Sequence, residues 1–307
     1  MRRVWNLGDL TFRQFVWRVL RRADADDVLG QSAKLSYFLV LAVFPLLIFL
    51  VALFGVLAPG TNMLQQLLAY WRRVLPGSAY ELVLKTLQEI SANAGGGKLS
   101  LGLVGTLWAA SGGMGAVIDG LNRAYKVKEG RPWWKAQLLS ILLTIALVIF
   151  IVMALSIVLY GNRIGEFAAT YVGLGAQFQI VWNIIQWPIG LGFVWLVFAL
   201  LYRVAPDLHD LEWSHVTPGA TVALVLWLLV SMGFRAYLRY FDHYGKTYGS
   251  LGAMIVLMLW FYFTGAAILL GGEVNAEIES IAARRGVPDA RLPGEKEPGE
   301  KRMQAKT

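Results

Sequence analysis

Long runs of apolar residues alternate with short polar segments along most of the chain. Six of these runs hold few or no charges and reach the length of about 20 residues that a helix needs to cross a hydrocarbon core. They are residues 35–58, 101–120, 136–160, 180–202, 216–237 and 250–270. The pattern therefore predicts an all-α fold, an integral membrane bundle of six transmembrane helices within a membrane domain of residues 35–272.

Amphipathic segments flank the predicted spans. In residues 1–34, apolar side chains share one helical face and arginines surround it: Phe12, Phe15, Val16, Val19 and Leu20, with Arg13, Arg18, Arg21 and Arg22. This pattern fits a helix on an anionic membrane surface, and equally a soluble helix packed on the ends of the spans. Residues 59–98 have the spacing of two amphipathic surface helices on the outer side. Residues 273–307 are expected to end the last helix and to form a disordered cytoplasmic tail from about Arg284.

Small residues are concentrated in the second predicted span. They recur every four positions in two sets, Gly105, Ala109 and Gly113, and Gly112, Ala116 and Gly120. Each set forms a groove on a helix that allows another backbone to approach closely. The second span is therefore expected to be a central packing helix, either within one bundle or between the protomers of a homo-oligomer. Prolines inside two other spans, Pro45 and Pro188, predict kinks.

Composition and charge support a membrane protein. Hydrophobic residues make up 57% of the chain and charged residues only 16%, against about 25% charged in soluble domains. The net charge of +8 lies between apolar blocks and at the termini, which argues against a nucleic-acid partner. With six spans and an inside N-terminus, 20 of the 28 lysines and arginines fall on the inner side. The positive-inside rule then predicts that both termini lie in the cytoplasm.

The sequence offers no motif for enzyme chemistry. There is no cysteine, and the three histidines, His209, His215 and His243, do not have the spacing of a metal site. Neither a GxSxG nor a P-loop motif occurs. We therefore expect no catalytic, cofactor or metal site, and ribonuclease or other hydrolase activity is disfavoured.

Ionisable and amide side chains gather at the predicted span ends, and the middles of the spans lack charges. One set, on the predicted cytoplasmic side, is a candidate inner gate or a structural polar lock: Lys34, Asp119, Asn122, Arg123, Glu273, Asn275 and Glu277. Within it, Asp119 and Arg123 are four residues apart and are expected to pair along one helix face. A second set is a candidate outer polar site or an interfacial anchor: Arg235, Arg239, Asp242 and Lys246.

Several stretches together resemble a known family. They are SAKLSYFLVLAVFPLLIFLVALFG, GTLWAASGGMGAVIDGLNRAYKVKEGRPWWK, YRVAPD, the PGA that opens the fifth span, and YGSLGAMIVLMLWFYFTGAAILLGGEVNAEIE. Over roughly residues 10–280 the chain is similar to the YihY/BrkB family, bacterial inner-membrane proteins once labelled ribonuclease BN. The resemblance implies six spans with both ends in the cytoplasm, and it brings no catalytic motif.

The function expected from this resemblance is transport or export of a small polar or amphiphilic solute. The alternative is an envelope factor that interacts with lipid and does not transport. The expected partners are membrane lipids and an unidentified solute, with no nucleic acid and no cofactor.

Overall fold

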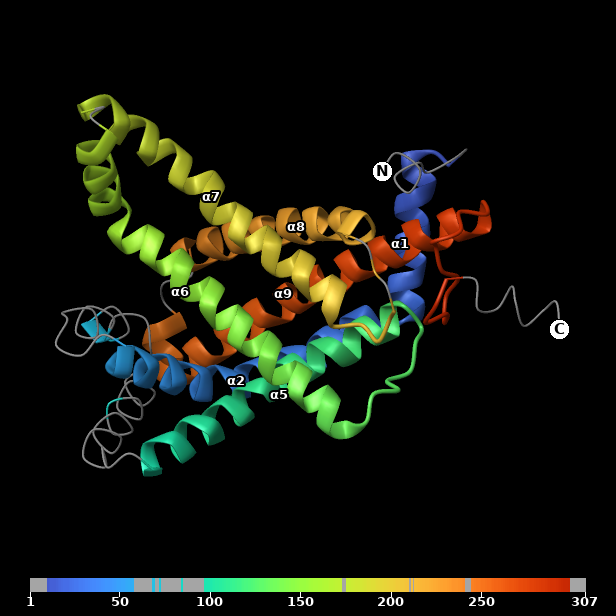
Figure 1. Ribbon diagram of the computed structural model, residues 1–307. Coiled ribbons are helices and arrows are strands. Elements are labelled where there is room, and N and C mark those ends of the chain that lie inside the picture. The colour runs from blue at the N-terminus through green and yellow to red at the C-terminus, as the bar shows by residue number, and fades with distance from the viewer. Residues whose placement is uncertain are drawn as a thin grey trace.

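The computed structural model describes residues 10–57, 97–172, 175–209, 211, 213–240 and 244–298, and the isolated positions 68, 69, 72 and 84. These residues form seven α-helices and no strand (Figure 1). The helices are α1 (Phe12–Ala25), α2 (Val28–Leu57), α5 (Gly97–Ala124), α6 (Trp133–Val172), α7 (Gly175–Val204), α8 (Trp213–Tyr240) and α9 (Tyr244–Arg284). The all-α prediction is confirmed for this part of the chain. The predicted surface helices of residues 59–98 lie almost entirely outside it.

Four helices contain stretches that are long and apolar enough to cross a membrane. They are Trp133–Met153, Ile184–Val204, Trp213–Tyr237 and Met254–Arg284. Helix α2 contributes the shorter apolar stretch Val28–Val43. Helices α2 and α5 still cover the first and second predicted spans. The structure thus supports a helical membrane protein with four candidate spans, while the count of six stays a prediction.

Six helices form a closed ring of neighbours along one long axis (Figure 1). In chain order each of α2, α5, α6, α7, α8 and α9 packs on the next, and α9 returns to α2. Helix α5 also contacts α9 across the ring. The largest buried core cluster includes Leu121, Tyr202, Val216 and Leu269, which come from four of these helices. The links 125–132 and 205–212 join neighbouring helices at the end of the ring where α1 lies, which we call the α1 end.

Helix α1 lies across this end and runs transverse to α2 in the view of Figure 1. It begins with a capping box, in which the Thr11 hydroxyl accepts from the Gln14 N–H and the Gln14 side chain accepts from the Thr11 N–H. The chain turns into α2 at Asp27, whose φ of 51° is left-handed. The Asp27 carboxylate accepts from the Gly30 N–H at 3.2 Å, which satisfies a donor in the first turn of α2.

Only some of the small residues of α5 pack against neighbouring helices. A side chain at Gly113 would meet Ala42 of α2, and one at Gly120 would meet Leu269 of α9. Ala116 is also buried. Gly105, Ala109 and Gly112 are exposed instead, and no described atom lies near the side-chain positions of the two glycines. A contact between protomers through that exposed part remains a prediction.

Helices α8 and α9 approach each other closely at Gly219 and Gly271. A Cβ atom on Gly219 would collide with the Gly271 carbonyl oxygen and with the Asn275 amide. We expect Gly219→Ala to lower the thermal unfolding midpoint by several degrees, because backbone atoms cannot move aside as a flexible side chain can. Gly112→Ala is the matched control, with open space at its Cβ position. It should leave the midpoint unchanged or raise it slightly, since alanine favours helix; equal losses in both variants would contradict the assignment.

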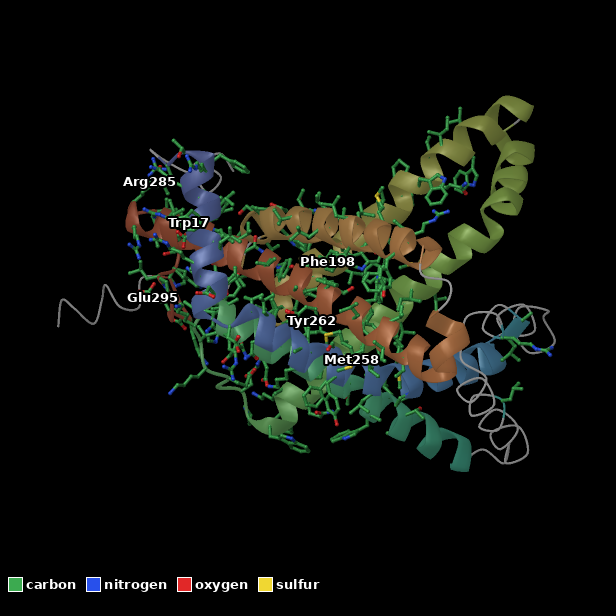
Figure 2. The ribbon with its side chains drawn as sticks, turned by 180° about the vertical axis from the view of Figure 1, so that it is seen from behind. Trp17, Phe198, Met258, Tyr262, Arg285 and Glu295 are labelled. Carbon is green, nitrogen blue, oxygen red and sulfur yellow. The ribbon has the colours of Figure 1, made fainter. Side chains whose placement is uncertain are left out.

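The segment after α9 differs from the expected disordered tail. Between Arg285 and Pro298 the chain folds back on the α1 end, and Ala290, Arg291 and Glu295 are buried. Figure 2 labels Glu295, Arg285 and Trp17 at the same end of the molecule. The composition of this segment is polar, which is typical of disorder. Specific ion pairs with the ends of the helices nevertheless hold the segment in place. We call residues 285–298 the C-terminal segment; residues beyond 298 lie outside the described part of the chain.

The two prolines lie inside helices as expected, Pro45 in α2 and Pro188 in α7. Each removes one backbone donor from its helix. Their roles as kinks or hinges remain predictions.

Candidate functional site

Arg22 of α1 holds two buried carboxylates at the end of α9. Its Nε donates to Glu273 at 3.1 Å and its Nη1 donates to Glu277 at 3.2 Å. The third nitrogen donates to the Ala124 carbonyl oxygen at 2.9 Å, which ties α5 into the same contact. Glu273 is 1% exposed, so its charge is stable there only with a partner of opposite sign. We call Arg22, Glu273 and Glu277 the Arg22 cluster.

Local sequence places these groups. Glu273 and Glu277 are one helical turn apart, so they face the same direction on α9. On α1, Phe15 and Val19 pack against Val274, Ile278 and Ile281 of α9. Arg22 follows Val19 by three residues and so lies on the same face of α1. The apolar contact of that face with α9 therefore places the guanidinium next to the two carboxylates.

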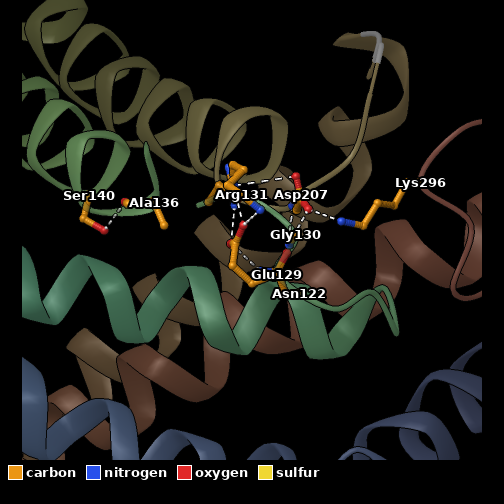
Figure 3. A network of polar contacts seen from close by, with 9 residues as sticks. Asn122, Glu129, Gly130, Arg131, Ala136, Ser140, Asp207 and Lys296 are labelled. Carbon is orange, nitrogen blue, oxygen red and sulfur yellow. Dashed lines mark hydrogen bonds and ion pairs between the residues drawn. The ribbon is translucent and has the colours of Figure 1, made fainter. Parts of the chain in front are cut away.

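A second network joins the two links at the α1 end (Figure 3). The Asn122 side chain donates to Glu129 at 3.0 Å and accepts from the Asp207 N–H at 2.7 Å. Asp207 accepts in turn from the Gly130 N–H at 2.9 Å and pairs with Lys296. Arg131 binds Glu129 through two nitrogens, each at 2.7 Å. We call Asn122, Glu129, Gly130, Arg131, Asp207 and Lys296 the loop network.

The acidic members of the loop network are held in their charged form. Burial by itself would raise the pKa of Asp207, but hydrogen bonds from Lys296 and the Gly130 N–H, with the charges of Lys296 and Arg131, lower it. Burial likewise opposes ionisation of Glu129, and the hydrogen bonds and charge of Arg131 outweigh it, so its pKa is also lowered. Both carboxylates therefore contribute as anions at neutral pH.

The lowered pKa values make the α1 end sensitive to acid. The unfolded chain takes up protons at these groups first as the pH falls. Their stabilisation is therefore complete above the usual carboxyl pKa of about 4–4.5, and it is lost progressively as the pH falls through the lower pKa values of the folded protein. We expect the thermal midpoint of the protein to fall in that range, and to fall less in Asp207→Asn. Asp24→Asn, which removes an exposed carboxylate of α1, is the control and should follow the wild type. Identical pH profiles for all three proteins would contradict the assignment.

The C-terminal segment is anchored by a third ion pair. Arg291 donates to Glu279 of α9 at 2.7 Å, and both side chains are nearly fully buried, at 2% and 3% exposure. Arg291 also donates to the carbonyl oxygens of Lys296 and His209. The Gly294 N–H donates to the Tyr125 carbonyl oxygen at 3.0 Å. The segment therefore straps both links to the end of α9.

Several buried polar atoms near this strap have no hydrogen-bond partner in the described part of the chain. They are the Tyr125 hydroxyl, both ring nitrogens of His215 and one carboxylate oxygen of Glu279. Burial, and next the charge of Glu279, raise the pKa of Tyr125 well above its usual value, so its hydroxyl remains a donor. Buried polar atoms are usually paired by protein, ordered water or a ligand. Ordered water is the ordinary partner of such atoms in a folded protein.

The candidate inner residues do not form one cluster. Glu273 and Glu277 meet at Arg22, and Asn122 belongs to the loop network. Asn275 lies elsewhere: it accepts from the Gly219 N–H at 2.7 Å and donates to the Val216 carbonyl oxygen at 3.2 Å, which links α9 to α8. All of these side chains lie at the α1 end.

The expected pairing of Asp119 with Arg123 is wrong. Asp119 binds Lys34 of the neighbouring helix α2 at 3.2 Å, and Arg123 is exposed. The side chains of Lys34 and Asp119 are 42% and 56% exposed, so this pair contributes little to stability. A neighbouring helix offers a charge in better position than the next turn of the same helix.

Of the candidate outer residues, the structure describes only Arg235, which is exposed on α8. The side chain of Arg239, and Asp242 and the side chain of Lys246, lie outside the described residues. An outer polar site therefore remains a prediction.

Sequence reasoning missed several residues of the site. They are Arg22, Glu129, Arg131, Asp207, Glu279, Arg291 and Lys296. One signal was present: three glutamates follow the last apolar run at alternate or four-residue spacing, at 273, 277 and 279, and such carboxylates need basic partners. In the described part of the chain, no group of three or more His, Asp or Glu side chains could hold a metal ion.

Comparisons with known proteins agree with this architecture. Residues 19–293 match the family model described as "Virulence factor BrkB". The ribonuclease-like protein YfkH of Bacillus subtilis (strain 168) is 38% identical over 275 residues, which cover 90% of this chain and 98% of YfkH. A UPF0761 membrane protein of Xanthomonas oryzae pv. oryzae (strain PXO99A) is 28% identical over 300 residues, 92% of this chain but 64% of its own length. No solved structure matches.

Proposed function

This chain is a membrane protein of the virulence factor BrkB family, and from that premise we propose that it transports or exports a small polar or amphiphilic solute. In this proposal it crosses the bacterial inner membrane six times, and the α1 end lies in the cytoplasm. The Arg22 cluster, the loop network and the Arg291–Glu279 pair then act together as an inner gate, captured closed.

The observation that carries the proposal is the concentration of buried charge at one end of an apolar ring. Buried ion pairs are costly, and a bundle is often as stable with apolar residues in their place. Charged groups at membrane level commonly mark the paths of solutes or ions. These pairs also join helices and links that are far apart in sequence, so breaking them would separate α1, α9 and the two links.

The unpartnered polar atoms support the same proposal. The Tyr125 hydroxyl, the His215 ring and one Glu279 carboxylate oxygen are buried without partners among the described residues. An entering polar solute could satisfy them once the segment moves.

The test compares the small-molecule content of medium and cytoplasm in cells with and without the protein. We expect at least one polar or amphiphilic metabolite to accumulate outside the cells that make the protein. Uptake of the same metabolite by inverted membrane vesicles should then require the protein. Equal profiles at confirmed expression would reject the transport proposal.

A second candidate function is an envelope factor that interacts with lipid without transport. Exposed tryptophans favour it, with Trp17 of α1 57% and Trp133 at the start of α6 71% exposed. An altered lipid extract with unchanged metabolites would select this candidate. Purified protein is expected to show no ribonuclease activity, although the relative YfkH carries a ribonuclease-like name.

A further inference from the structure

Helix α1 has two faces with different chemistry. One face is fixed on the bundle: Phe15, Val19 and Ala23 are buried, and Arg22 enters the Arg22 cluster. The side turned away from the bundle carries large apolar side chains in the open, with Trp17 57% and Leu20 49% exposed. Phe12 lies in line with the packed face, at the beginning of the helix, and is 75% exposed. Apolar area of this size on one short helix is unusual for a surface that meets only water.

The orientation of α1 fits a membrane surface. The long helices run along the axis that crosses the membrane, and α1 lies across that axis at their end (Figure 1). Its capping box and the turn at Asp27 fix where the helix begins and ends. A helix held in this direction lies parallel to the bilayer, at the depth where the spans emerge.

The charges on the exposed side are mainly basic. Arg13, Arg18 and Arg21 are exposed, against Asp24 among the acidic residues of the helix. The Arg21 guanidinium lies over the Trp17 ring at 5.4 Å from its centre, and Arg18 reaches Glu277 of α9 at 3.8 Å. Arginine beside tryptophan suits a boundary where anionic phosphate meets hydrocarbon.

The same pairing recurs on other helices. Arg203 lies over the Trp213 ring at 4.5 Å, where the link between α7 and α8 reaches the α1 end, and Lys135 lies over the Trp134 ring at 5.3 Å where α6 begins beside α5. Trp134 and Trp213 are 57% and 42% exposed. The Trp17 and Trp213 pairs thus lie on separate elements at the α1 end. One layer of lipid headgroups can contact both pairs, whereas a docked protein would need a matching surface for each.

We propose that α1 is a membrane-surface helix that binds anionic phospholipid headgroups of the adjacent leaflet. Arg13 and Arg21 bind the phosphates, while Phe12, Trp17 and Leu20 enter the boundary with the acyl chains. Arg22 of the same helix binds Glu273 and Glu277. Lipid bound to the exposed side of α1 therefore stabilises the Arg22 cluster. That last effect, regulation of the inner gate by lipid, rests on the proposed function; lipid binding itself does not.

The test uses the full chain in nanodiscs of phosphatidylcholine alone or mixed with phosphatidylglycerol, read by hydrogen–deuterium exchange of the α1 amides. We expect slower exchange in the anionic discs, by roughly fivefold for each arginine bound, so about 25-fold for two. Arg13→Gln and Arg21→Gln should each remove about one fivefold step. Arg235→Gln, which takes the same charge from an exposed position on α8, should change nothing.

Three results would overturn the proposal. One is equal exchange in neutral and anionic discs. Another is unchanged protection in Trp17→Ser and Leu20→Ser, which would show that the apolar side chains do not enter the membrane. The third is protection in detergent without phospholipid that grows with protein concentration, which would assign this face to a second copy of the chain. Since exchange is measured without solute, these outcomes are independent of the transport test.

Discussion

Replacement of Arg22 by alanine is expected to lower the free energy of unfolding by about 3–5 kcal/mol, the usual cost of removing one partner of a buried ion pair. The Arg22 side chain is 14% exposed and Glu273 is 1% exposed, so the carboxylate left behind has little access to water. Helix α1 also loses its bond to the Ala124 carbonyl oxygen. The loss should appear as a fall of about 10 °C in the thermal midpoint of the detergent-solubilised protein.

Two further variants make this prediction specific. Arg21→Ala removes the same charge from the exposed side of α1 and should change the midpoint by no more than about 2 °C. Glu273→Gln and Glu277→Gln, added to Arg22→Ala, remove the stranded charges and should recover part of the loss. Equal midpoints for Arg22→Ala and Arg21→Ala would show that the Arg22 cluster does not support the α1 end.

Replacement of Arg291 by alanine is expected to release the C-terminal segment. Arg291 and Glu279 are both nearly fully buried, and the same guanidinium binds two carbonyl oxygens, so the stabilisation lost should again be about 3–5 kcal/mol. Much of that loss falls locally, because the segment can detach while the helices stay folded. Limited trypsin digestion should therefore cut after Lys296 faster than in the wild type, by an order of magnitude or more.

Arg284→Ala is the control for this second prediction. Arg284 is exposed at the end of α9 and supplies the same charge seven residues earlier, so its loss should leave the digestion rate at Lys296 unchanged. If the wild type is already cut rapidly at Lys296, residues 285–298 are disordered, as their composition predicts, and the assignment of an anchored C-terminal segment is wrong.

Residues 285–298 were expected from composition to be disordered, and the structure shows them ordered. Proline, glycine, lysine and glutamate between 285 and 298 favour disorder by composition. The structure orders the segment through Arg291 on Glu279 and Lys296 on Asp207, which is 89 residues away in the chain. Composition shows how many charges a segment has, but it does not show which oppositely charged residues of other segments will lie beside them in the fold.

The sequence left two interpretations of α1 open, and the structure is compatible with both. The amphipathic pattern of residues 12–25 allowed packing on the helix ends or contact with a membrane surface. In the structure Phe15 and Val19 pack on α9, while Phe12 and Trp17 remain exposed. The hydrophobic pattern is wider than one contact uses, so a single helix can meet two surfaces.

The sequence by itself determined the all-α fold of the described residues, the four apolar stretches that are long enough to cross a membrane, and the family of this protein. Those properties are local: hydropathy and helical spacing act over about 20 neighbouring residues. Only the tertiary structure decided which charges meet, as Arg22 with Glu273 across 251 residues shows. An ion pair forms where packing brings two side chains within a few ångströms, and that distance depends on how α1, α5 and α9 cross rather than on any one of them.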